Sequence, residues 1–321
     1  MNSKPETIDS KPGTIRALLE LARPANVITA WADILAGVAL AIGLDHHLAI
    51  EQGNSIFWFI TDIGESGLVP ALGWLLLATT GLYAGGVTLN DVYDAELDAV
   101  ERPERAIPSG RISRHHALLF GSVLLVIGIL AAFQVNTLAG WLACGIAILA
   151  VLYDRYSKHH TSPGPLNMGL CRAGNLVLGM TIMPAIILWQ FGIIPLIYIG
   201  AITAISQGEV HGGSRKTGYL AVALVLLIVL GLAGLMLHET PRFISGIGFL
   251  LFFTWLVLPS FLRAARNPQA QNVRRAVRAG IMGLIPLNAT LAAAAAGWIV
   301  GLSLLLLLPI SILLARLFAV T

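Results

Sequence analysis

Three aspartates gather in a short stretch, NDVYDAELD (residues 90–98), that directly follows an apolar run. At 100° per residue, Asp91, Asp94 and Asp98 lie within about 60° of one another around a helix. Like charges crowded on one face repel, and each is costly to desolvate at the edge of a bilayer. A divalent cation relieves both problems, and Mg²⁺ is commonly held by one or two carboxylates together with substrate phosphates. The stretch therefore predicts a magnesium site that receives a phosphorylated substrate.

A plainer interpretation is a solvated helix end whose acids are balanced by the two arginines that follow, Arg102 and Arg105. Three features favour the cation site instead. The acids share a face, they begin with the amide of Asn90, and they end a segment long enough to cross a membrane. The arginines then provide bidentate contacts to phosphate oxygens.

The composition requires membrane helices to position these groups. The chain has 321 residues, of which 56% are hydrophobic and 12% charged, and its mean hydropathy is +0.80. A soluble domain is about 25% charged. The apolar residues form long blocks, such as 117–133 and 220–237, instead of spaced stripes. This excludes a soluble enzyme, a disordered chain and a β-barrel, and predicts a polytopic all-α membrane protein.

We expect nine or ten transmembrane helices in one bundle. A polar cytoplasmic arm, residues 1–22, precedes a single transmembrane domain, residues 23–321. The predicted spans are 27–44, 67–89, 116–133, 137–153, 166–189, 191–207, 218–237, 243–262, 279–299 and 301–319.

Basic residues predict the orientation of the bundle. All of the 20 Lys and Arg residues except Arg242 and Arg316 fall in the N-terminal arm or in alternate connections between spans. The first opposite loop contains Asp45, Asp62 and other acids, with no basic neighbour. By the positive-inside rule, the N-terminus and the aspartate-rich stretch face the cytoplasm, in the cell (inner) membrane. The net charge of +3 is therefore a topological signal, and we expect no nucleic-acid partner.

These motifs resemble those of the UbiA superfamily of intramembrane prenyltransferases. The family's first motif, NDxxDxxxD, matches Asn90, Asp91, Asp94 and Asp98, and its Arg-rich, Pro-Ser-Gly continuation matches residues 102–110. The resemblance runs from about Arg23 to the end of the chain. Its further elements are an RPxN entry at Arg23–Asn26, a tyrosine and lysine at Tyr153 and Lys158, and fifth-span residues at Asn175 and Gly179.

The chain departs from the family at the second motif, DxxxD, which is followed by Arg-Lys-x-Gly. The tail is present as residues 215–218, but Val210 and Ser214 stand where the aspartates belong. Glu209, one residue off register, is the nearest carboxylate, and His211 adds a nitrogen. This departure is similar to the EboC-like subgroup of the family. It leaves open whether Glu209 holds metal or lies in a loop without a metal role.

The resemblance implies a UbiA-like fold and a Mg²⁺-dependent transfer of an isoprenoid group from a polyprenyl diphosphate to a lipophilic, aromatic acceptor within the lipid bilayer. It implies metal ligation by Asp91, Asp94, Asp98 and Glu209. It implies catalytic roles for Asp91, Asp94, Lys158 and Tyr153, and diphosphate or acceptor binding by Asn26, Asn90, Arg102, Arg105, Asn175, Arg215 and Lys216.

Two alternatives stay open. A protein with this fold and an altered second motif could bind or help translocate an isoprenoid or metabolite precursor without turnover, and a conventional secondary transporter is a third class. Asp33 is costly in a lipid-spanning segment, so we expect it to face a polar cavity near Asn26. Tyr83 is a further candidate for the cavity wall.

Overall fold

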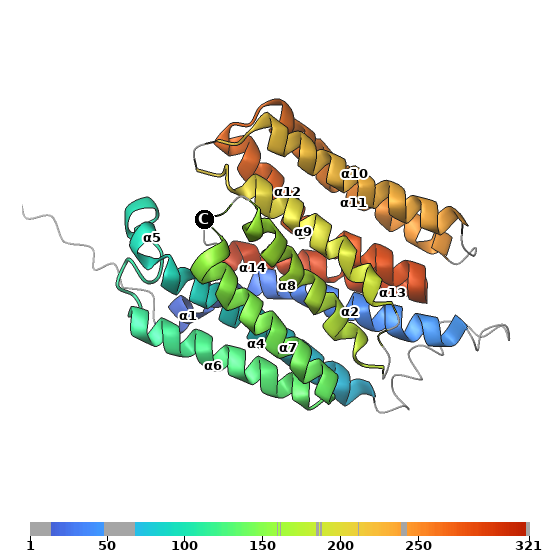
Figure 1. Ribbon diagram of the computed structural model, residues 1–321, viewed down its shortest axis with the longest axis horizontal. Coiled ribbons are helices and arrows are strands. Elements are labelled where there is room, and N and C mark those ends of the chain that lie inside the picture. The colour runs from blue at the N-terminus through green and yellow to red at the C-terminus, as the bar shows by residue number, and fades with distance from the viewer. Residues whose placement is uncertain are drawn as a thin grey trace, which may run out of the picture.

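The computed structural model describes residues 14–47, 68–158, 160, 162–183, 186, 188–210, 212–238 and 243–318. Within these ranges the regular structure is entirely helical (Figure 1). The helices are α1 (Thr14–Ala22), α2 (Pro24–His47), α4 (Leu68–Tyr93), α5 (Ala95–Glu101), α6 (Arg114–Phe133), α7 (Thr137–Leu152), α8 (Pro163–Met180), α9 (Ile193–Ser206), α10 (Arg215–His238), α11 (Ile247–Arg266), α12 (Ala270–Ala296), α13 (Trp298–Leu305) and α14 (Leu307–Leu317). A π-helical turn, η2 (Tyr153–Ser157), extends α7, and two 3₁₀ turns, η3 (Trp189–Gly192) and η4 (Phe243–Gly246), precede α9 and α11.

Nine helical segments in the described ranges are long and apolar enough to cross a membrane. The last of them joins α13 and α14 into Trp298–Leu317, and it is separated from α12 by Gly297 at φ 97°. The remaining predicted span, 166–189, corresponds to the shorter α8, which buries Asn167, Arg172 and Asn175 and is less apolar than the others. The predicted fold, an all-α bundle of nine or ten membrane helices, is confirmed.

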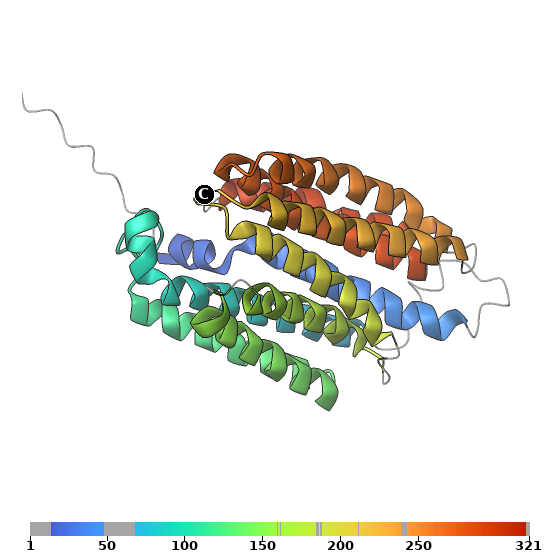
Figure 2. The same ribbon diagram turned by 45° about the horizontal axis from the view of Figure 1, so that its top comes forward.

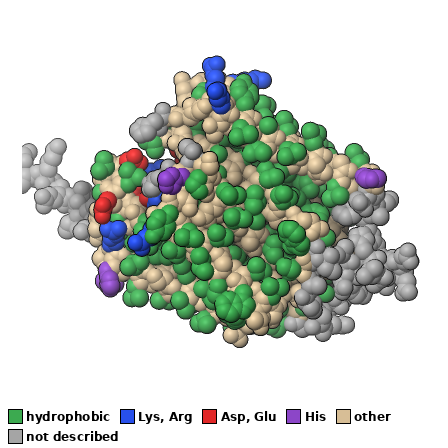
Figure 3. Space-filling view, in the orientation of Figure 1, with side chains coloured by type: hydrophobic (Ala, Val, Ile, Leu, Met, Phe, Trp, Pro, Cys, Tyr) green, Lys and Arg blue, Asp and Glu red, His purple; other side chains and the backbone are tan. Residues whose placement is uncertain are grey.

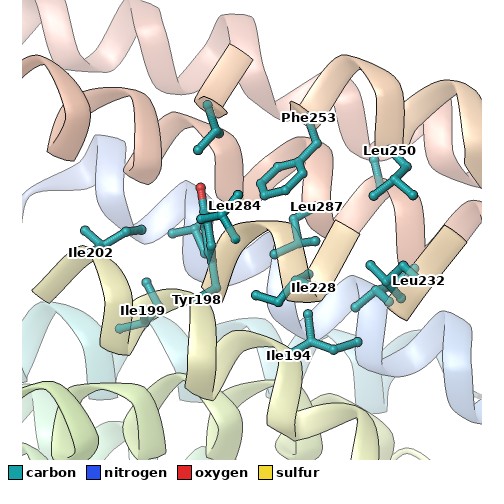
Figure 4. Close-up of a cluster of buried hydrophobic side chains, with 14 of the residues drawn as sticks. Ile194, Tyr198, Ile199, Ile202, Ile228, Leu232, Leu250, Phe253, Leu284 and Leu287 are labelled. Atoms are coloured by element: carbon teal, nitrogen blue, oxygen red, sulfur yellow. The ribbon is translucent and has the colours of Figure 1, made fainter. Parts of the chain in front are cut away.

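α2 and α12 form the centre of the bundle. Within each of their apolar spans 72% of the residues are buried, against 22–39% in the other seven. Figures 1 and 2 show α4, α6 and α7 on one side and α9, α10 and α11 on the other, with α2 and α8 between them. The second half has its own apolar core, drawn in Figure 4, where the ring of Tyr198 meets Phe253 edge-on at a centroid distance of 5.3 Å.

The surface suits a lipid environment. Large apolar side chains such as Trp141, Leu230 and Trp255 are exposed on the outward faces of α7, α10 and α11. In the space-filling view hydrophobic side chains cover most of the visible face, whereas charged side chains gather at its left end and at its top (Figure 3). Exposed apolar area of this extent marks contact with a membrane rather than with water. The chain is an integral, multi-pass membrane protein.

Close contact between α2 and α8 positions the polar groups inside the bundle. A Cβ atom added at Gly37 would lie 2.1 Å from the carbonyl oxygen of Leu176, and one at Gly179 would lie 2.3 Å from that of Ile34. Only glycine permits the two backbones to approach so closely. The contact places Asp33, one turn from Gly37, beside the polar residues of α8.

Candidate active site

A cavity of about 310 Å³ lies between the two halves of the bundle. Its lining combines an apolar wall with polar groups from several helices, and it includes four residues that the sequence analysis singled out as site residues: Asn26, Asn90, Tyr153 and Asn175. Tyr83 also lines it. The apolar wall comes from Leu82, Val87, Ile146, Ala150, Ile199, Ile202, Ile281 and Leu284, and the other polar lining residues are Arg23, Thr79, Asp154, Arg172, Thr203 and Ser206. The cavity can therefore hold a molecule with one charged and one hydrocarbon part.

Asp91, near the end of α4, is paired with two arginines. Arg23 donates from Nη2 to Asp91 Oδ1 at 2.6 Å, and Arg105 donates from Nη1 to the same oxygen at 3.2 Å. Arg105 also reaches Asp98 Oδ2 at 2.7 Å. Asp91 and Asp98 are 6% and 5% exposed. Arg105 thus connects two of the three aspartates that were predicted to share a face.

Arg23 has an unusual backbone conformation that allows this contact. It joins α1 to α2, and its φ of 48° is the one positive value among the described non-glycine residues. A following proline, Pro24, disfavours the ordinary helical conformation at this position. Positive φ at a bulky residue is strained, and such strain is typical of functional positions. Here it accompanies a guanidinium that pairs with Asp91 and lines the cavity.

Asp94 breaks the helix between α4 and α5 and contacts a different base. Its carboxylate accepts a hydrogen bond from Lys158 Nζ, which follows the π-helical turn η2. The side chain of Lys158 is 9% exposed and that of Asp94 is 18% exposed. Each of the three aspartates of the first motif is therefore neutralised by a basic side chain in this structure.

Asp154 joins the same group, although the sequence analysis did not select it. Asn90 donates from Nδ2 to Asp154 Oδ1 at 2.8 Å. Asp154 is 4% exposed and lines the cavity, and its Oδ2 has no hydrogen-bond partner among the described residues. The signal available in the sequence was an acid placed between Tyr153 and Lys158, at the end of an apolar span where an unpaired charge is costly.

Asp33 is the centre of a buried polar network instead of a cavity residue. Arg172 and Asn175 of α8 both donate to its Oδ2, and Asn288 of α12 donates to its Oδ1 at 2.7 Å. Arg172 also lies over the ring of Tyr83, with its Cζ 5.0 Å from the ring centroid. The network joins α2, α8 and α12 and orients Arg172 and Asn175, which do line the cavity. Asp33 was predicted to face a polar cavity near Asn26; instead it is buried in this network and does not line the cavity.

The second motif lies in a turn after α9. The helix ends at Ser206, and Gly212 has a φ of 91°. Burial raises the pKa of the Glu209 carboxyl, and the charges of Arg102 and Arg274 oppose this shift. Glu209, Arg215 and Lys216 do not line the cavity, and Arg215 and Lys216 are exposed at the start of α10. His211 lies outside the described residues. The roles expected of Glu209, Arg215, Lys216 and Arg102 stay predictions.

The donor set matches Mg²⁺ in kind. Within the described ranges, no three Asp, Glu, His or Cys side chains converge closely enough to hold a metal ion. Asn90, Asp91, Asp94 and Asp154 nevertheless offer only hard oxygen donors on neighbouring turns, and the free Oδ2 of Asp154 is the one buried carboxylate oxygen without a partner there. Mg²⁺ prefers such donors and completes its shell with water and phosphate oxygens.

The sequence was then compared with known families. The UbiA prenyltransferase family matches residues 48–276. The chain belongs to this family. The predicted family, all-helical fold and enzyme class, a prenyltransferase, are confirmed at this level, while the EboC-like subgroup stays a prediction.

Curated relatives extend the match beyond that segment. Digeranylgeranylglyceryl phosphate synthase of Methanosarcina mazei is 28% identical over 253 residues, which cover 73% of this chain and 82% of the relative. The enzyme of the same name from Methanopyrus kandleri is 28% identical over 295 residues, which cover 86% of this chain and 100% of the relative.

Two solved structures share the fold. A structure described for digeranylgeranylglyceryl phosphate synthase in membranes aligns with a TM-score of 0.59 at 18% identity, covering 88% of this chain and 99% of that one. A UbiA homologue from Archaeoglobus fulgidus bound to DMAPP and Mg²⁺ aligns with a TM-score of 0.57 at 17% identity, covering 85% and 98%. At these identities the likeness concerns the fold.

Proposed function

We propose that this protein transfers an isoprenoid group from a polyprenyl diphosphate to a lipophilic acceptor, with Mg²⁺ as cofactor. The observation that carries the proposal is the juxtaposition of the Asn90–Asp98 motif and its three basic partners with a cavity whose wall is largely apolar. Charged groups suit the diphosphate, and the apolar wall suits the hydrocarbon. The solved UbiA homologue that binds DMAPP and Mg²⁺ supports this choice of ligands.

Asp91 and Asp94, assisted by Asn90, would hold the cation. When bound, Mg²⁺ supplies positive charge that stabilises the departing diphosphate. Arg23, Arg105 and Lys158 pair with these carboxylates in this structure. Once the cation neutralises the carboxylates, the three bases become available for phosphate oxygens, and the two arginines can make bidentate contacts. The same groups would therefore serve as internal counter-ions and then as diphosphate ligands.

The cavity wall would protect the reacting carbon. Departure of diphosphate breaks the allylic C–O bond and leaves a carbocation, which water would capture. Val87, Ile199 and Ile202, which line the cavity, would exclude water from the reacting carbon, and the ring of Tyr83 lines the same cavity. An electron-rich acceptor atom attacks the carbocation, and its surplus proton must leave to a base. Tyr153, which lines the cavity, would orient the reacting groups.

We infer that the acceptor is lipophilic, because it must enter through apolar helices. An aromatic acceptor is the expectation from the family resemblance. The relatives' name, digeranylgeranylglyceryl phosphate synthase, points instead to a prenylated glyceryl phosphate. Offering a phenolic acid and a geranylgeranylglyceryl phosphate to the same preparation separates the two acceptor classes.

The test uses purified protein, labelled geranylgeranyl diphosphate and Mg²⁺, with diphosphate release and labelled lipid product as readouts. Release that requires Mg²⁺ and an acceptor is expected. Tight binding of the diphosphate without cleavage would favour the alternative, a binding or translocating protein, which the missing aspartates at Val210 and Ser214 make the second candidate. No binding of the diphosphate would contradict both.

We also propose that the N-terminus, the Asn90–Asp98 motif and the mouth of the cavity face the cytoplasm, in the cell membrane. The charge asymmetry of the loops supports this. With Cys144 and Cys171 replaced by alanine, a membrane-impermeant maleimide added to intact cells should label Gln134→Cys, in the turn between α6 and α7, and spare Glu104→Cys. The reverse pattern would overturn the orientation.

The domain division, arm 1–22 and transmembrane domain 23–321, is likewise our proposal. α1 belongs to the arm, and it is amphipathic: Ala17 and Leu21 are buried against Val92, Ala106 and Ile112. Its Glu20 pairs with Arg111 of the connection that follows the aspartate motif. α1 therefore covers the polar end of the first half.

A further inference from the structure

One carboxylate at the cavity has an unused oxygen. Asp154 is 4% exposed, its Oδ1 accepts a hydrogen bond from Asn90, and its Oδ2 has no hydrogen-bond partner among the described residues. Burying a carboxylate oxygen without a partner is strongly unfavourable. The neighbouring carboxylates differ in this respect, because Asp91, Asp94 and Asp98 each bind a basic side chain.

The second motif does not supply an equivalent group at the cavity. Val210 and Ser214 replace its aspartates, and Glu209 is outside the cavity lining and close enough to Arg102 and Arg274 for their charges to act on it. A cation held by one cluster alone is anchored from one side only. Asp154 comes from η2, a helical turn separate from the first motif, and it lines the same cavity.

We infer that Asp154 supplies the carboxylate that the second motif lacks, and that its Oδ2 binds the divalent cation of the donor diphosphate. The inference rests on the proposed function. Asn90 has a defined part in it: its 2.8 Å hydrogen bond to Oδ1 holds the carboxylate in place and leaves Oδ2 free for the cation. Such orienting hydrogen bonds around a metal ligand are a general feature of metal sites. The π-helical turn also places Tyr153 and Asp154, which are consecutive, on the cavity lining together.

The test measures cation binding rather than turnover. Purified full-length protein is titrated with Mn²⁺ in the presence of geranylgeranyl thiolodiphosphate, a donor analogue that resists cleavage, and free Mn²⁺ is followed by electron paramagnetic resonance. Asp154→Asn keeps the volume of the side chain and an oxygen for Asn90 while it removes the anionic ligand. Glu96→Gln, an exposed acid in α5, controls for the loss of one negative charge.

The concentration of Mn²⁺ needed for half-saturation should rise at least about tenfold in Asp154→Asn, and stay within about twofold of wild type in Glu96→Gln. Thermal unfolding of each variant establishes that it is folded, and Asp154→Ser is measured as a second variant of the same site. A wild-type affinity in folded Asp154→Asn and Asp154→Ser would overturn the inference while leaving the proposed function intact.

Two other outcomes separate the remaining possibilities. An equal loss in Glu209→Gln would show that the second motif still provides a ligand, and would overturn the replacement by Asp154. Absence of Mn²⁺ binding by wild type in the presence of the analogue would contradict the proposed function itself, and the inference with it.

Discussion

The ends of α4 and α9 carry the family's two motifs, and they have become very different. At the end of α4, Asp91, Asp94 and Asp98 pair with three basic side chains from separate parts of the chain, Arg23, Arg105 and Lys158. At the end of α9 the helix stops at Ser206 and a glycine-rich turn follows. One end concentrates charge beside the cavity, whereas the other contributes Thr203 and Ser206 to its wall.

The difference shows what a buried carboxylate needs in order to persist. Asp91 is accommodated inside a membrane protein because Arg23 and Arg105 pair with it at hydrogen-bond distance. At the second end Arg215 and Lys216 are exposed at the start of α10 and do not line the cavity, and Arg102 and Arg274 act on Glu209 through their charges.

Removing the most strongly paired acid should have the largest effect. Asp91→Asn deletes a hard anionic ligand, so the affinity for prenyl diphosphate with Mg²⁺ present should fall at least about tenfold, ~1.4 kcal/mol. It also leaves Arg23 and Arg105 short of a counter-charge, and breaking a buried pair costs about 3–5 kcal/mol of stability. Isothermal calorimetry and thermal unfolding of the detergent-solubilised protein measure the two losses.

Asp94→Asn is the matched comparison at the same end. Asp94 is more exposed and pairs with Lys158 alone, so it should lose diphosphate affinity as Asp91→Asn does but lose less stability. Unchanged affinity in both variants would return the motif to the plainer interpretation of a solvated helix end.

Much of this end was predictable from the sequence. The length of the apolar blocks gave the helices, and the NDxxDxxxD spacing with its arginines gave the polar cluster, because both are local patterns. The same local reasoning was less accurate for α8, which was predicted as an apolar span over 166–189 but ends at Met180 and buries several polar residues. Its Arg172 and Asn175 are polar for a membrane helix, yet both donate hydrogen bonds to Asp33 of the distant helix α2.

Long-range contacts were not predictable. Arg23 meets Asp91 across 68 positions, and Asn90 meets Asp154 across 64. No periodicity links such residues, since only the packing of α2, α4 and α7 brings them together. For Asp154 the sequence offered one local signal, an acid between Tyr153 and Lys158 at the end of an apolar span, and nothing that linked it to Asn90.

Restoring the aspartates of the second motif should change diphosphate binding less than removing those of the first. Val210→Asp with Ser214→Asp re-creates the family's i, i+4 pair, which would share a face only on a helix. In this structure α9 ends at Ser206, and the φ of 91° at Gly212 interrupts any continuation. We therefore expect the Mg²⁺ concentration for half-maximal diphosphate binding to change by less than about threefold, below 1 kcal/mol.

A large gain in diphosphate cleavage by this double variant would contradict that expectation. It would mean that the turn refolds into helix when the aspartates return, and that wild type had been restricted to binding. Val210→Asn with Ser214→Asn, which adds similar volume without charge, is the control.

The smallest effect is expected at Glu209, and it should appear in stability more than in cation binding. Burial raises the pKa of this carboxyl above its ordinary value of 4.5, so between pH 4.5 and the raised value the folded chain binds more protons than the unfolded chain. The free energy of unfolding should therefore fall as pH rises through this window, and the loss persists at neutral pH.

Glu209→Gln cannot titrate, so it should lack this loss and unfold at a slightly higher temperature than wild type at neutral pH. Thermal unfolding from about pH 4 to pH 8, with Glu96→Gln as the exposed control, measures the difference. Arg102 and Arg274 make this loss of stability smaller, because their charges favour the ionised carboxylate of Glu209. A Glu209→Gln variant that is less stable than wild type at neutral pH, or that needs much more Mg²⁺, would show that the end of α9 still holds a working carboxylate.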